Sequence, residues 1–71
     1  MASAARGMVV DFDARRGLGR VRADDGAELP FHCTRIADGT RTIAVGARVR
    51  FRPGPGPAGW EAHDVEALER G

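Results

Sequence analysis

The chain has 71 residues, of which 42% are apolar and 30% are charged, and its formal net charge is +1. A chain of this length makes one small domain that buries only about 60% of its unfolded surface, which leaves little room for the enclosed cleft of an enzyme. This composition is typical of a globular protein rather than a disordered tail, and the net charge does not by itself indicate a polyanionic partner.

The start of the chain, Met1 to Arg6, has no apolar run long enough for a signal peptide, and no later segment approaches the length of a membrane span. The single cysteine, Cys33, excludes an intramolecular disulfide and fits a reducing compartment. We therefore expect a cytoplasmic protein with no membrane partner, in which residues 1–5 form a flexible tail.

Five short segments with the composition of β-strands follow, separated by turn signals. They are Gly7 to Asp13, Leu18 to Ala23, Glu28 to His32, Arg48 to Arg52 and about Trp60 to Leu68. The second segment alternates, with Leu18, Arg20 and Arg22 on one side and Gly19, Val21 and Ala23 on the other. One side of this strand therefore faces the core and the other faces water.

The second and third segments are joined through the pair Asp25-Gly26, which favours a hairpin because glycine accepts a positive φ. In the third segment Leu29 and Phe31 are expected to point inward, while Pro30 and His32 point outward. These two strands should therefore lie side by side.

The fourth segment alternates most cleanly, with Val49 and Phe51 inward and three arginines outward. The arginine row either contacts a nucleic-acid backbone or, as we favour, forms a solvated face. After a loop at Pro53 to Gly59, the last segment is interpreted as a strand with Val65 as its best core residue. A helix is the alternative, but the other strands need a fifth to close a barrel.

These features predict an all-β fold, a small five-stranded antiparallel OB-fold barrel, with a longer connection between the third and fourth strands. The domain is expected to span residues 6–68, with a C-terminal tail at residues 69–71. We expect it to be a monomer.

The order of glycines, apolar residues and basic residues along nearly the whole chain resembles the cold-shock domain family. The matching positions are Gly7, Val9, Phe12, Asp13, Arg16, Gly17, Gly19, Val21, Phe31, His32, Ile36, Gly46, Val49, Phe51, Gly59 and Val65. The resemblance implies a protein that binds single-stranded RNA or DNA, as an RNA chaperone or a modulator of transcription or translation.

The chain departs from the family at the positions where bases stack on aromatic side chains. Those positions hold Asp11, Leu18, Arg20, Pro30, Cys33 and Thr40, so that only Phe12 and His32 remain. Stacking contributes roughly 1–3 kcal/mol per base, and losing four platforms at the low end removes about 4 kcal/mol, near a thousandfold in affinity. We therefore expect weak binding.

Arginine side chains can compensate in part, since Arg20 can stack on a base while Arg16, Arg22 and His32 contact phosphates or base edges. Trp60 is interpreted first as a plug of the barrel end, with a relocated stacking platform as the alternative. The predicted nucleic-acid-binding residues are Phe12, Arg16, Leu18, Arg20, His32 and Trp60.

No catalytic or metal-binding constellation is found, and no cofactor is expected. His32 has no acid or nucleophile at a spacing that would orient it, and the neighbouring Cys33 should point to the opposite face of its strand. Gly17 and Gly19 precede a strand rather than a helix, which favours points of close approach over a phosphate-binding loop.

A second function from another class remains open. The barrel could have lost nucleic-acid binding and use its remodelled face to bind a protein, because Asp11, Leu18, Arg20 and Pro30 form a mixed polar and apolar patch. We favour nucleic-acid binding on the basis of the family resemblance.

Overall fold

The computed structural model describes residues 4–57 and 59–68. The chain forms one antiparallel sheet of five strands in the order β3-β2-β1-β4-β5. The elements are β1 (Ala5–Asp13), β2 (Leu18–Ala23), β3 (Glu28–His32), a 3₁₀ helix (Cys33–Arg35), β4 (Arg48–Gly56) and β5 (Gly59–Ala67). The described residues contain no helix with the length and apolarity needed to cross a membrane. Of the expected tails, residues 1–3 and 69–71 lie outside the described residues.

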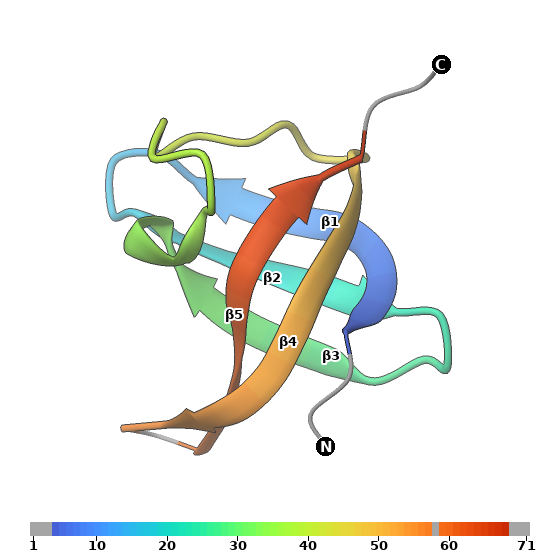
Figure 1. Ribbon diagram of the computed structural model, residues 1–71. Coiled ribbons are helices and arrows are strands. Elements are labelled where there is room, and N and C mark those ends of the chain that lie inside the picture. The colour runs from blue at the N-terminus through green and yellow to red at the C-terminus, as the bar shows by residue number, and fades with distance from the viewer. Residues whose placement is uncertain (1–3, 58, 69–71) are drawn as a thin grey trace.

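The sheet coils into a partly closed barrel, because β4 and β5 cross β1, β2 and β3 steeply (Figure 1). Near the end of β5, Ile36 forms a parallel bridge with Val65, and the N–H of Ala37 donates to the Val65 carbonyl at 2.7 Å. This contact joins the segment after β3 to β5. The predicted all-β, OB-type architecture is confirmed, and so is the interpretation of the last segment as a strand.

The core lies between the two halves of the coiled sheet. Its buried members are Val9, Val21, Phe31, Ile36, Val49, Phe51, Ala62 and Val65. The inward positions predicted for the second, third and fourth strands are confirmed, with Leu29 half-buried at the margin. The hairpin between β2 and β3 is also confirmed, and Gly26 takes φ 98° there.

A β-bulge in β1 changes which side of the strand its later residues face. Val9 pairs with Val21 but Asp11 pairs with Arg20, so that Val10 is an extra residue in β1. Before the bulge Val9 faces the core, and after it Phe12 packs against the core while Asp11 faces outward. The bulge therefore places a carboxylate on the outer face of the sheet.

The prediction of a loop at residues 53–59 is wrong. β4 continues to Gly56, and Pro53 pairs with Ala62 while Pro55 pairs with Trp60. Among the described residues the pairing of β4 with β1 ends at Phe51. The prolines therefore lie where β4 is at an edge of the described sheet, and an edge is where a strand tolerates proline.

The prediction that Trp60 plugs the barrel end is also wrong. Its side chain is 63% exposed. The reason is the extended β4–β5 hairpin, whose tip projects from the body of the barrel (Figure 1) and carries Trp60 opposite Pro55.

Gly19 should be intolerant of a side chain, because a Cβ there would lie 2.5 Å from the Phe31 ring and 2.9 Å from the Asp11 carbonyl oxygen. We expect Gly19→Ala to lower the free energy of unfolding by roughly 1–3 kcal/mol through overpacking. Denaturant unfolding measures this change. The control Arg20→Ala, next in β2 but on its exposed side, should change stability by about 0.5 kcal/mol or less. Equal stability of the two variants would contradict this packing.

Candidate nucleic-acid interface

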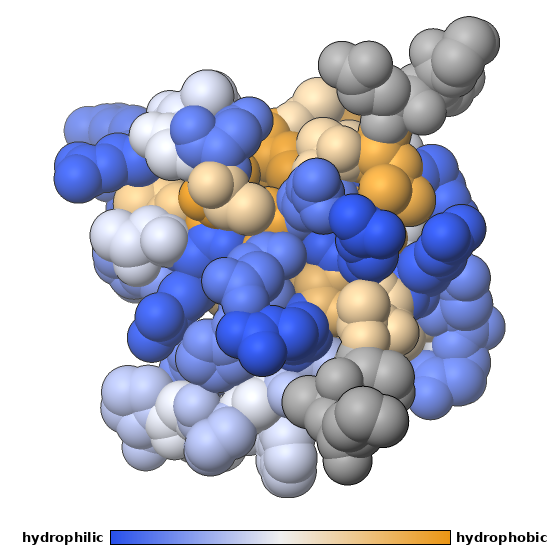
Figure 2. All heavy atoms as spheres, in the orientation of Figure 1, coloured by the Kyte–Doolittle hydropathy of each residue, from blue (hydrophilic) through white to orange (hydrophobic). Residues whose placement is uncertain are grey.

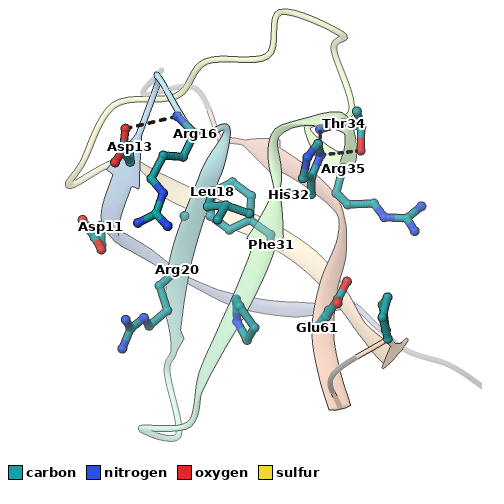
Figure 3. A pocket seen from close by; sticks show the side chains of 13 residues that line it. Asp11, Asp13, Arg16, Leu18, Arg20, Phe31, His32, Thr34, Arg35 and Glu61 are labelled. Atoms are coloured by element: carbon teal, nitrogen blue, oxygen red, sulfur yellow. Dashed lines mark hydrogen bonds between the residues drawn. The ribbon is translucent and has the colours of Figure 1, made fainter.

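A groove of 610 Å³ lies on the outer face of β1, β2 and β3 and is bounded on its far side by the β4–β5 hairpin (Figure 3). The strands contribute the outward side chains Asp11, Asp13, Leu18, Arg20, Pro30 and His32. The connecting segments and β5 add Arg16, Thr34, Arg35, Pro57 and Glu61. The groove therefore combines apolar, cationic and anionic side chains.

Strand register assembles this surface from residues far apart in the sequence. Across β1, β2 and β3, one row consists of Asp13, Leu18 and His32 and the next of Asp11, Arg20 and Pro30. Directly opposed residues in antiparallel strands have Cβ atoms about 4.5–5.5 Å apart. The structure thus brings four of the predicted contact residues, Arg16, Leu18, Arg20 and His32, to one groove.

Phe31 forms the floor of the groove and stacks on Phe12 on the inner side of the same strands. Phe12 pairs in register with Gly19, which pairs with Phe31. The two rings stack with centroids 6.0 Å apart and an interplanar angle of 11°. Phe31 is 1% exposed and lines the groove from below, whereas Leu18 is 46% exposed above it. Phe12 is half-buried and is not among the lining residues, so its contribution is to support Phe31.

His32 is held in a fixed orientation at the start of the 3₁₀ helix. The backbone N–H of Thr34 donates to its Nδ1 at 3.2 Å, and the Thr34 hydroxyl lies 3.0 Å from the same atom. Because Nδ1 acts as an acceptor, a neutral ring carries its proton on Nε2. Among the described residues, no group of three or more His, Cys, Asp or Glu side chains could hold a metal.

Arg16 is positioned by the turn between β1 and β2. The carboxylate of Asp13 accepts hydrogen bonds from the backbone N–H groups of Arg15 at 3.0 Å and Arg16 at 3.2 Å. Gly17 then takes φ 69°, and its carbonyl accepts a hydrogen bond from Cys33 at 2.7 Å. This turn holds the Arg16 side chain at the rim of the groove (Figure 3).

The ionic groups that line the groove balance one another. They are the carboxylates of Asp11, Asp13 and Glu61 and the guanidinium groups of Arg16, Arg20 and Arg35. A surface of this kind lacks the strong positive potential that attracts a phosphate backbone over long range. Attraction of an oligonucleotide therefore depends on individual contacts.

Arg20 is partly neutralised by a neighbour on β3. Glu28 accepts hydrogen bonds from Nε and Nη2 of Arg22 at 3.0 and 2.8 Å, and Nη1 of Arg20 lies 3.6 Å from its other oxygen. The hydrogen bond from Arg22 is the largest cause of a lowered pKa of Glu28, and the positive charge of Arg20 acts in the same direction. Arg22 makes the closer contacts with Glu28, so the guanidinium group of Arg20 is the more available of the two to a ligand.

The arginine row of β4 is paired with acidic side chains instead of facing the groove. Its ion pairs are Arg48 with Asp24, Arg50 with Glu66 and Arg52 with Asp64. The face over which β4 and β5 run is mostly hydrophilic (Figure 2). This arrangement supports the solvated-face interpretation of the row.

Trp60, like Phe12, is a predicted contact residue that does not line the groove. Its neighbour Glu61 lines the groove, and adjacent residues of a strand point to opposite faces. Arg35 and Glu61 line the groove but are not among the contact residues predicted from the sequence. Their placement follows from the 3₁₀ helix and from the extended hairpin, and neither residue carries a local sequence signal that indicates a groove.

Comparisons with known proteins agree with this geometry. The family model described as the 'Cold-shock' DNA-binding domain matches residues 5–68. The cold shock-like protein CspG of Shewanella violacea is 34% identical over 70 residues, which is 96% of this chain and 100% of that protein. The solved structure of drosophila Unr CSD456 matches with a TM-score of 0.79 at 23% identity. That match covers 96% of this chain and 28% of the Drosophila chain, and it shows the fold.

The Glu28 carboxyl should titrate below the ordinary pKa range of glutamate because Arg22 donates to its ionised form. Its contribution to stability is then present above the unfolded-state pKa and is lost as the pH falls through the folded-state pKa. Side-chain carboxyl NMR should show that Arg22→Ala raises this pKa, whereas Arg50→Ala on the opposite face leaves it unchanged. An unchanged midpoint in Arg22→Ala would contradict the assignment.

Proposed function

Because the chain belongs to the cold-shock domain family, a family of nucleic-acid-binding domains, we propose that its groove binds single-stranded RNA or DNA. The observation that carries the proposal is the convergence of Arg16, Leu18, Arg20 and His32 on one groove above the buried ring of Phe31. The protein acts by binding and not by catalysis, as a cytoplasmic monomer that serves as an RNA chaperone or modulates transcription or translation.

The groove suits unpaired bases rather than a duplex. Unpaired bases can turn outward, lie on apolar or aromatic side chains and expose their edges for hydrogen bonding. Leu18 and Pro30 provide an apolar surface, and His32 provides the aromatic side chain of the outer rows. Arg16 and Arg35 stand at the rim, where they can contact phosphates.

Binding should be weak for two reasons. The outer rows Asp13–Leu18–His32 and Asp11–Arg20–Pro30 hold one aromatic side chain, and each missing platform removes roughly 1–3 kcal/mol of stacking. The carboxylates of the groove also repel phosphates. Phe12 contributes through the floor, and Trp60 on the neighbouring hairpin can stack a base of an oligomer that extends past Pro57.

A protein-binding role is the second candidate, and the balanced charge of the groove favours it. Equal numbers of carboxylates and guanidinium groups line the surface. Mixed charge around apolar side chains is compatible with a modest protein interface. This candidate predicts that the same groove fails to bind any oligonucleotide.

Substitution of Arg20 tests the site directly. Under the proposal Arg20→Ala weakens binding of a short single-stranded oligomer, because a cationic contact is lost. Arg20→Phe strengthens it at least about fivefold, because a stacking platform contributes about 1–3 kcal/mol. Fluorescence anisotropy with a labelled uridine or thymidine oligomer measures both changes.

Arg50→Ala is the matched control, since Arg50 is exposed, paired with Glu66 and located on another face of the barrel. It should leave the affinity close to that of the unchanged protein. If neither Arg20 variant differed from this control, the groove would not be the binding site.

A further inference from the structure

Two acidic side chains in the groove differ from the other carboxylates that the structure describes. Those others each accept a hydrogen bond or form an ion pair: Asp13, Asp24, Asp25, Glu28, Asp38, Asp64 and Glu66. Within residues 4–57 and 59–68, Asp11 and Glu61 have no such partner, and both line the groove. Unpaired acceptors therefore gather at the site where a ligand would bind.

Of the two, Asp11 is the better placed to contact a ligand. The carboxylate of Glu61 lies directly over Gly56, where even a Cβ atom would clash with it, so this side chain packs along the β4–β5 hairpin. Asp11 is exposed and stands opposite Arg20 in the strand register. A base lying over Leu18 and Pro30 would present its edge toward β1, where the Asp11 side chain stands (Figure 3).

Carboxylate chemistry limits which base can be recognised. An ionised carboxylate only accepts hydrogen bonds, and its two oxygens suit two parallel N–H donors. Guanine has two adjacent donors, N1–H and the N2 amino group, on its Watson–Crick edge. On the same edge uracil offers one donor between two acceptors, and cytosine and adenine each offer one amino group beside a ring-nitrogen acceptor, which a carboxylate repels. An unpaired guanine is therefore the base that best complements Asp11.

We propose that Asp11 gives the groove a preference for an unpaired guanine, whose N1–H and N2 amino group donate to the carboxylate. This inference rests on the proposed function and names the base that the groove selects. Arg20, next to Asp11 on β2, contacts the phosphate or the face of the same nucleotide. The edge of a paired guanine is occupied by its partner base, so the preference applies to single strands.

Three short oligomers test the proposal. The first contains only uridine, the second has a guanosine at its centre, and the third has an inosine at its centre. Inosine is guanosine without the N2 amino group. We expect the guanosine oligomer to bind roughly tenfold more tightly than the uridine oligomer, since a bidentate contact discriminates by about 1–3 kcal/mol. The inosine oligomer should fall between them. Anisotropy at fixed low salt gives the three dissociation constants.

Asp11→Asn is the informative variant, and Glu61→Gln is its matched control, because each removes one negative charge from the groove. Both should bind the uridine oligomer more tightly, through reduced repulsion of phosphates. Asp11→Asn should lose the guanosine preference, whereas Glu61→Gln should keep it.

Two results would overturn the inference. If the unchanged protein bound all three oligomers equally, or if Asp11→Asn kept the preference, Asp11 would not read the base while the proposed binding function still stood. If no oligomer bound at all, the proposed function would fail and the base preference with it.

Discussion

The stacked row Phe12–Gly19–Phe31 is the contact on which the groove depends. Two aromatic rings from β1 and β3 meet on the inner side of β2 because the residue between them has no side chain. This packing fixes the register of the three strands, and with it the two outward rows that flank the stacked row. The bulge at Val10 is equally necessary, since it turns Phe12 inward and Asp11 outward. The groove thus lies on the outer face of these three strands, directly above the packed aromatic rings.

The groove differs from the β4 face in how its charged side chains are paired. On the β4 side, arginines and acids neutralise one another in pairs, such as Arg50 with Glu66. Such exposed pairs contribute little to stability, about 0–1 kcal/mol each. In the groove, by contrast, Asp11 and Glu61 have no ionic partner among the described residues, and Arg20 shares Glu28 with Arg22. These groups are available to a ligand, and their mixed signs make recognition depend on local contacts more than on long-range attraction.

Sequence periodicity predicts much of this fold, because a period of two over half-buried strands leaves a clear pattern. The inward positions Val21, Phe31, Val49 and Phe51 are buried, and the segment around Val65 is a strand. The Pro- and Gly-rich stretch misleads, since prolines usually indicate a loop but are tolerated on an edge strand. The prediction that Trp60 plugs the barrel end is wrong for the same reason: the Pro- and Gly-rich stretch is part of an extended hairpin, which carries the indole away from the barrel end.

The site is less predictable than the fold. Leu18, Arg20 and His32 are placed correctly on the outer face because their strands alternate without interruption. Phe12 lies on the inner side because the bulge shifts the alternation of β1, and a bulge of this kind has no clear sequence signal. The side of the groove formed by the β4–β5 hairpin depends on tertiary structure, which brings Glu61 toward β3.

The most direct test of the central claim is an NMR titration of labelled protein with short single-stranded RNA and DNA oligomers at two salt concentrations. Phosphate contacts weaken with the logarithm of salt concentration, so true binding should be tighter at low salt. We predict saturable shifts confined to the groove and its hairpin side: Asp11, residues 16–20, residues 30–35, Trp60 and Glu61. The absence of shifts at millimolar oligomer and low salt would contradict this prediction and would point to a groove that binds a protein instead.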